Sequence, residues 1–209
     1  MNNALRSVLY HVHDPMCSWC WGYRRTWDRL RQALPKQVQV VNVLGGLAPD
    51  SDQAMPLAQR ETIAGYWRDV SSATGAEFNF DFWTQCTPRR STYPACRAVL
   101  AAQRQSAEQD MIDAIQQAYY LRAMNPSDNS TLINLAEELG LNRHQFAADL
   151  RSPETQQALE REFDLRRKLG VREFPSLVLE RGDKRAPITI DYRTHESALV
   201  EIAELIDAQ

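Results

Sequence analysis

The sequence lacks an excess of basic residues, a long apolar run and a dense set of cysteines. Its 209 residues carry 24 Lys and Arg against 27 Asp and Glu, for a formal net charge of −3. That balance argues against nucleic acid as a partner. No apolar run approaches the ~20 residues that a membrane helix requires, so no membrane association is expected.

No secretory leader is expected from the N-terminal residues. The first apolar stretch, residues 8–10, is interrupted by His11 and His13 and closed by Asp14. It is too short and too polar for the core of a signal peptide, and no small-residue cleavage site follows it. The sequence therefore predicts a cytoplasmic protein.

The cysteines number only four, at positions 17, 20, 86 and 96. In a reducing cytosol such a set is not expected to form a structural disulfide framework. A close pair in that compartment is more often catalytic or metal-binding. The remaining composition, 44% hydrophobic and 24% charged, is that of an ordinary globular chain.

Two β-branched segments, residues 7–12 and 38–44, predict buried strands. Between them, residues 21–34 show helical spacing, with Trp27, Leu30 and Leu34 on one face and Pro35 as the stop. A strand, a helix and a strand in this order predict a parallel βαβ unit.

Residues 49–150 show no convincing strand and instead repeat apolar residues at helical spacing. Helices are predicted within 95–102, 111–121, 132–139 and 146–150, with Gly140 ending the third and Asn142 capping the fourth. Aromatic residues of this block are expected to form its core or the wall of a groove: Tyr66, Trp67, Phe78, Phe80, Phe82, Trp83, Tyr119 and Tyr120. The block reads as a helical subdomain inserted into a framework formed by residues 1–48 and 151–209.

The C-terminal part returns to mixed structure. Ser152 and Pro153 predict the start of a helix that Gly170 ends. Residues 176–180 and 188–190 predict a hairpin around Gly182, and residues 195–206 a final amphipathic helix. The fold class is therefore α/β.

Cys17 and Cys20, in the motif Cys-Ser-Trp-Cys, stand between the first predicted strand and the first helix. A thiol at a helix N-terminus meets unpaired N–H groups and the positive end of the helix dipole, which favour the thiolate. Two intervening residues let the second sulfur reach the first within one helical turn. Cys17 is therefore predicted to be the exposed attacking thiol and Cys20 the more buried resolving thiol.

Trp19 and Trp21 offer apolar surface beside this motif for a peptide-like partner, with simple packing equally expected for Trp21. On the preceding strand His11 and His13 share one face, opposite Tyr10 and Val12. A residue under the motif can accept the proton of Cys20, although solvated imidazoles at a strand end are the more common outcome.

His13 and Asp14 are expected to tune Cys17 electrostatically. Arg24 and Arg25 on the first helix can favour the thiolate as well, but a solvated face is the default for them.

The segment from Asp14 to Gly22, Asp-Pro-Met-Cys-Ser-Trp-Cys-Trp-Gly, resembles the DsbA-like family, and within it the FrnE-like branch. Gly170-Val171 with Phe174-Pro175-Ser176-Leu177 resembles the cis-proline loop of that family. The resemblance covers essentially the whole chain.

This resemblance implies a thioredoxin-like fold with an inserted all-helical subdomain, a redox-active disulfide at Cys17 and Cys20, and no bound cofactor. It also implies that Pro175 is cis and that Phe174 and Pro175 contact substrate, whose backbone pairs with the loop. Trp19, through its apolar surface beside the motif, is the third expected substrate contact. Phe174 is bulkier than the residue usual before that proline, and a cytoplasmic location differs from that of the periplasmic members.

Three interpretations are open for Cys86 and Cys96: a second redox pair, zinc ligands together with the first pair, or small hydrophobic residues of the interior. Nine residues between the two cysteines do not form a zinc knuckle, so no metal is predicted. Buried or half-buried thiols are the expectation, because free cysteine is among the most buried residue types. Cys96 starts an apolar helical segment, whereas Cys86 stands in a loop-like stretch where exposure is the alternative.

The leading hypothesis is a thiol–disulfide oxidoreductase, extending to protein disulfide isomerisation, that acts on proteins or on small thiols such as glutathione. It is expected to be a monomer or a homodimer. One alternative is a glutathione-dependent isomerase of the 2-hydroxychromene-2-carboxylate type, which needs a serine at position 17 and no Cys20. The other is a chaperone-like module that binds partners without redox chemistry.

Overall fold

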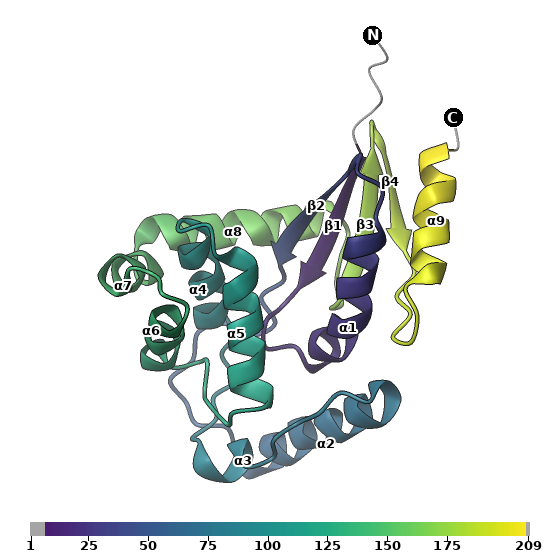
Figure 1. Cartoon of the computed structure of the whole chain (residues 1–209). Coiled ribbons are helices and arrows are strands. Elements are labelled where there is room, and N and C mark those ends of the chain that lie inside the picture. The colour runs from purple at the N-terminus through teal and green to yellow at the C-terminus, as the bar shows by residue number, and fades with distance from the viewer. Residues whose placement is uncertain (1–6, 208–209) are drawn as a thin grey trace.

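The computed structural model describes residues 7–207. The N-terminal residues 1–6, part of the region searched for a leader, lie outside the described residues. The chain contains four strands and nine helices within that range (Figure 1). In chain order these are β1 Ser7–His13, α1 Ser18–Ala33, β2 Val38–Leu44, α2 Leu57–Thr74, α3 Phe82–Gln85, α4 Tyr93–Gln103, α5 Glu108–Tyr120, α6 Asn129–Glu138, α7 Arg143–Leu150, α8 Pro153–Lys168, β3 Ser176–Arg181, β4 Lys184–Ile188 and α9 Glu196–Asp207.

The strands form one sheet in the order β2-β1-β3-β4. β1 pairs with β2 in parallel, as the βαβ pattern predicted, and β3 pairs antiparallel with both β1 and β4. α1 and α9 lie on one side of the sheet (Figure 1), where Leu9, Leu30 and Ile202 share one core cluster. On the other side α8 packs against β2, and Val12 and Val43 meet Leu165.

The helices between β2 and β3 surround a hydrophobic core cluster that is larger than either cluster at the sheet. α4 is buried along most of its length and contacts α5, α6, α7 and α8. Trp67 of α2 lies 1% exposed among the aromatic rings of Phe78, Phe82, Tyr119 and Tyr120. The expected aromatic core is therefore present, while Tyr66 and Phe80 are exposed and lie outside its buried centre. The division into two subdomains at residues 48 and 150 stays a prediction.

Several boundaries differ from those predicted. The first helix begins at Ser18, three residues before the segment in which helical spacing was recognised, and the motif supplies its first turn as its predicted position implied. α2 was not predicted as a helix, since only Ala64, Trp67 and Val70 of its 18 residues are buried and they form a weak apolar pattern. The caps at Asn142 and Ser152 are confirmed, each accepting a hydrogen bond from the backbone N–H three residues later.

The predicted position of the strand that pairs with β3 is wrong by several residues. β4 spans Lys184–Ile188 rather than 188–190, and Pro187 lies inside it. Proline usually indicates the end of a strand, because it has no backbone N–H to donate. β4 is the edge strand of the sheet, where proline is tolerated.

The turn after β2 packs tightly against the loop that precedes β3. A Cβ atom at Gly45 would lie 2.2 Å from the ring of Phe174, so only glycine lets the two segments approach this closely. The Arg166 guanidinium of α8 donates to the Gly45 carbonyl at 2.7 Å and lies 5.9 Å from the centre of the same ring. Three elements distant in sequence therefore meet at Gly45.

Gly45→Ala is expected to lower the free energy of unfolding by about 1–3 kcal/mol, because the ring must leave its position. Phe174→Ala should remove most of that cost, and the four proteins form a double-mutant cycle that denaturant unfolding can measure. An equal cost of Gly45→Ala with and without the Phe174 ring would contradict the proposed contact.

Candidate active site

The Cys-Ser-Trp-Cys motif lies where β1 passes into α1. Cys17 is the N-cap residue of α1, and its carbonyl accepts the first helical hydrogen bond from the Trp21 N–H at 3.0 Å. The turn before it is closed by the Cys17 N–H, which donates to the Asp14 carbonyl at 3.0 Å. The predicted placement of the first cysteine at a helix N-terminus is therefore confirmed.

Cys17 is less accessible than predicted. It is only 7% exposed, because the loop containing Phe174 closes over it and its thiol donates to the Phe174 carbonyl at 3.6 Å. The pKa of the Cys17 thiol lies below its ordinary value. The hydrogen bond with the Cys20 side chain contributes most to this shift, the N–H groups of Cys20 and Trp19 add to it, and burial opposes it.

Cys20 is 5% exposed and lies inside the first turn of α1. Burial, followed by the interaction with Cys17, raises its pKa well above the ordinary thiol value. The two sulfurs of the motif therefore differ in proton affinity in the direction that separates an attacking thiol from a resolving one.

The Phe174–Pro175 peptide bond is cis, as the resemblance implied. Phe174 is half-buried and presents its carbonyl to Cys17 while its ring rests on Gly45. The bulk of Phe174 is thus matched by the absence of a side chain at position 45. Gly45 and Arg166 were not predicted as site residues, since their role depends on a contact between β2, α8 and the loop before β3.

Asp14 is fully buried beneath the motif. Its carboxylate accepts hydrogen bonds from the N–H groups of Met16 and Leu47 at 2.8 and 2.7 Å and from the Thr92 hydroxyl at 2.7 Å. Burial raises the pKa of Asp14, and these hydrogen bonds oppose that rise. Its charge also acts to raise the pKa of Cys17, so any tuning of Cys17 by Asp14 opposes the thiolate.

The solvated imidazoles expected at the end of β1 are a wrong prediction. His11 and His13 are 7% and 1% exposed, and their rings stack at 4.7 Å with an interplanar angle of 5°. They share one face as predicted, but α1 covers that face, and Trp27 stacks on His11 at 4.1 Å. Burial lowers the pKa of both, that of His13 to about 4.

Cys86 and Cys96 do not pair with each other. The Cys96 thiol is fully buried and donates to the Asp14 carboxylate at 3.7 Å, while half-buried Cys86 donates to the Ala123 carbonyl at 3.0 Å. Within residues 7–207 no group of three or more His, Cys, Asp or Glu side chains could hold a metal ion. The same residues contain no helix with the length and apolarity to cross a membrane.

Trp21 and Arg24 of α1, both considered from the sequence as neighbours of the thiols, are engaged in contacts with the helical block. Trp21 packs, with its ring stacked on Tyr120 at 5.4 Å and its indole N–H donating to the Glu77 carbonyl. Arg24 is not a free cation beside the thiols, since it pairs with Asp113 at 3.0 Å.

A cavity of about 400 Å³ opens over Cys17. Its wall includes Trp19 and Phe174 from the predicted site, and Met55, Trp67 and Tyr119 from the helical block. Arg89, Arg90 and Arg172 add positive charge around it. A hollow of this size with a mostly apolar wall and a few charged groups is typical of a site for a small organic ligand.

Burial of His13 in its neutral form makes stability depend on pH. The unfolded side chain gains a proton near pH 6.5, whereas the folded one does so only near pH 4. The unfolded state therefore binds more protons between these values, and His13 is expected to reduce the free energy of unfolding by up to about 3 kcal/mol as pH falls through them.

His13→Gln should flatten that fall, measured by denaturant unfolding from pH 7 to pH 4. Asp14 acts in the opposite direction because its pKa is raised, so the difference between the two proteins is the informative quantity. The exposed His144→Gln variant is the control. Parallel pH curves for the wild type and His13→Gln would refute the expectation.

The model of a family described as thioredoxin matches residues 10–191 of this chain. A solved structure from Nitrosomonas europaea, described as that of a candidate protein disulfide isomerase, is 29% identical with a TM-score of 0.83. It covers 98% of this chain and 100% of its own. The cytosolic disulfide reductase DsbM of Pseudomonas aeruginosa, also solved with GSH, shares the fold at 21% identity and a TM-score of 0.76, over 97% of this chain and 100% of its own.

Among curated proteins, the ClpXP adapter protein SpxH of Halalkalibacterium halodurans is 23% identical over 81% of this chain. The chain spans 57% of the length of that relative. The thioredoxin match runs from β1 past the end of β4, and the sheet, the cis-proline loop and the helices between β2 and β3 agree with it. The chain belongs to the thioredoxin family and has the DsbA-like form of its fold.

Proposed function

We propose that the protein is a thiol–disulfide oxidoreductase that works through Cys17 and Cys20. One observation carries the proposal. The two thiols of the motif have opposite pKa shifts, lowered at Cys17 and raised at Cys20, and Cys17 lines the cavity that the Phe174 loop borders. A low-pKa thiol is available as thiolate near neutral pH, and thiolate is the nucleophile of disulfide exchange.

The exchange proceeds in two balanced steps. The Cys17 thiolate attacks one sulfur of the bound disulfide, forms a mixed disulfide and releases the other sulfur as a thiolate. Cys20 then loses its proton and attacks Cys17, which forms the Cys17–Cys20 disulfide and releases the second thiolate. The substrate disulfide is reduced and the two cysteines are oxidised; the reverse sequence oxidises a dithiol.

The cavity favours a small thiol with carboxylates, of the glutathione type. Arg89 is held by Asp128 at 2.5 Å and by the Ser127 carbonyl. Arg90 and Arg172 are exposed and make no ion pair in the described part of the chain. Two guanidinium groups at the rim of an apolar cavity suit the carboxylates of such a molecule, and a structure of DsbM with GSH supports this choice.

A cytoplasmic location is part of this proposal, and the cytosolic reductase with the same fold supports it. Isomerisation of protein disulfides is the natural extension, supported by the likeness to the candidate protein disulfide isomerase of Nitrosomonas europaea.

Two alternative functions remain to be compared with this proposal. The 2-hydroxychromene-2-carboxylate isomerase alternative is disfavoured by the presence of both Cys17 and Cys20. Binding without redox chemistry is the second candidate, since SpxH is described as an adapter.

Replacement of each motif cysteine should separate the two steps. Cys17→Ser is expected to abolish reaction with glutathione disulfide, whereas Cys20→Ser should accumulate one glutathione per protein, which intact-protein mass spectrometry detects. Cys86→Ser, a half-buried thiol outside the motif, is the matched control and should behave as wild type. Full activity of the Cys17→Ser variant would exclude the proposed chemistry and favour the binding module.

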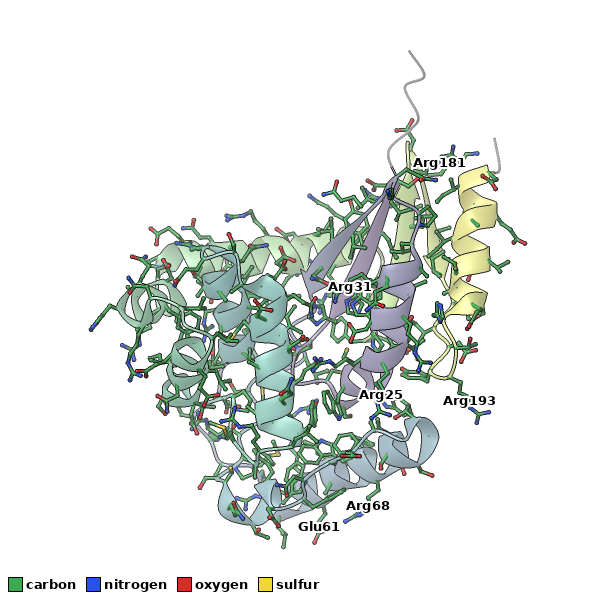
Figure 2. All side chains as sticks on the ribbon, in the orientation of Figure 1. Arg25, Arg31, Glu61, Arg68, Arg181 and Arg193 are labelled. Carbon is green, nitrogen blue, oxygen red and sulfur yellow. The ribbon has the colours of Figure 1, made fainter. Side chains whose placement is uncertain are left out.

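The carboxylate-binding role of the two arginines predicts a selective defect. The double variant Arg90→Gln/Arg172→Gln should react about fivefold more slowly with glutathione disulfide, since exposed charge contacts contribute about 0.5 kcal/mol each. Its rate with uncharged hydroxyethyl disulfide should not change. Arg193→Gln is the control, because Arg193 extends into solvent from the segment before α9 (Figure 2). An equal loss with both disulfides would show that the arginines do not recognise carboxylates.

A further inference from the structure

A second large hollow, a groove of about 480 Å³, lies beside α1. One wall is the part of α1 that contains Trp21, Arg25 and Arg29, and the other walls are the end of α2 and the segment before α9. Within residues 7–207, no residue lines both this groove and the cavity over Cys17. The disulfide exchange proposed above therefore leaves the groove unused.

Contacts between α1 and its neighbours hold the walls of the groove in place. A Cβ atom at Gly22 would lie 2.7 Å from a side-chain carbon of α2, so the absence of a side chain lets α2 pack closely against α1. The Trp21 indole N–H donates to the Glu77 carbonyl at 3.0 Å, and the Thr26 hydroxyl donates to the Tyr192 carbonyl at 3.0 Å. A groove whose walls are already fixed lowers the entropic cost of binding a partner.

The groove carries positive charge, although the chain as a whole has a net charge of −3. Arg25, Arg29 and Arg193 are exposed and make no ion pair in the described part of the chain. Arg25 and Arg29 are one turn apart on α1, and Figure 2 shows Arg193 on the segment before α9. Three unpaired guanidinium groups around one groove attract anions.

The acidic residues that line the groove do not cancel this charge. Asp28 lies 3.9 Å from Arg24 and 3.3 Å from Arg31, so its carboxylate already has cationic partners. Glu77 is the other acidic residue of the lining, against four arginines. The net charge of the lining is therefore positive.

The arrangement favours an extended anion over a small one. A small anion such as phosphate is held by donors that converge on one point. Here the unpaired arginines come from two turns of α1 and from a separate segment, and half-buried Trp21 and exposed Leu121 add apolar surface to the same groove. A polypeptide segment with apolar residues among its carboxylates matches both the charges and the apolar surface.

We propose that this groove is a docking site for an acidic, partly apolar segment of a protein partner. Arg25, Arg29 and Arg193 bind carboxylates of that segment, and Trp21 and Leu121 pack against its apolar side chains. Because different residues line the two hollows, a partner bound here leaves the cavity over Cys17 open. Docking at the groove is independent of the redox chemistry.

A fluorescein-labelled peptide of four Glu-Asp-Leu repeats is a suitable probe, and fluorescence anisotropy at low ionic strength measures its binding to the full chain. A second peptide with Gln and Asn in place of Glu and Asp should bind about tenfold more weakly, because it lacks the charge contacts with the arginines. Equal binding of the two peptides would show that the groove does not recognise carboxylates and would overturn the proposal.

Arg25→Glu/Arg29→Glu should weaken binding of the acidic peptide at least about tenfold, because charge reversal replaces attraction with repulsion. Arg151→Glu/Arg161→Glu reverses two exposed arginines outside the groove and changes the net charge equally. This control should bind within about twofold of the wild type. Equal weakening by both variants would indicate a general charge effect and overturn the proposal, as would unchanged binding by Arg25→Glu/Arg29→Glu.

The glutathione adduct of the Cys20→Ser variant tests whether the two sites are separate. The peptide should bind this adduct and the unmodified protein with affinities within about twofold. Loss of peptide binding in the adduct would place the peptide in the cavity over Cys17 and overturn the proposal. Failure of the adduct to form would instead contradict the redox function, while the arginine variants still decide the docking role.

Two further measurements distinguish other occupants of the groove. Binding of inorganic pyrophosphate in a calorimetric titration, without binding of the peptide, would assign the groove to a small anion. Dimerisation of the wild type in sedimentation experiments that Arg25→Glu/Arg29→Glu abolishes would assign it to a second copy of the chain. Either result would overturn the proposal.

Discussion

The carboxylate of Asp14 accepts hydrogen bonds from the N–H groups of Met16 and Leu47, from the Thr92 hydroxyl and from the Cys96 thiol. These donors come from the motif loop, the segment after β2 and the start of α4, so one fully buried group joins the sheet to the helical block at the reactive cysteine. A buried carboxylate is costly unless its oxygens are satisfied, and here four donors satisfy them. The placement of Cys17 against the cavity depends on this group.

The buried Asp14 carboxylate has an electrostatic effect on the two thiols of the motif, because it raises the pKa of both. A negative charge close to two thiols disfavours thiolate, and burial of both sulfurs has the same effect. The N-terminus of α1 and the hydrogen bond from Cys20 outweigh these effects at Cys17, but nothing comparable reaches Cys20 from its own helix. The asymmetry between the two cysteines is thus a consequence of one helical turn.

The sequence was informative where the chemistry is local. The motif, its position at the start of a helix, and the caps at Asn142 and Ser152 all follow from residues within a few positions of each other. The parallel pairing of β1 and β2 follows from the order strand, helix, strand along the chain. Phe174 and Pro175 could be assigned to the site only through the family resemblance. Burial of His11 and His13 could not be read from β1 alone, because it depends on which face α1 and α5 cover. Arg166 and Gly45 were missed for the same reason, since their contact joins residues 121 positions apart.

The two sides of the motif can therefore change independently. On the outer side, the Phe174 ring resting on Gly45, the arginines at the rim and the apolar residues of α2 line the cavity that opens over Cys17. On the inner side, the histidine pair and the ion pair between α1 and α5 face Cys20 and contact no part of the larger cavity. Substitutions in the wall of the larger cavity leave the side chains beside the inner face of Cys20 untouched. This separation follows from the single turn of α1 between the two sulfurs, which directs one towards the ligand and the other towards the sheet.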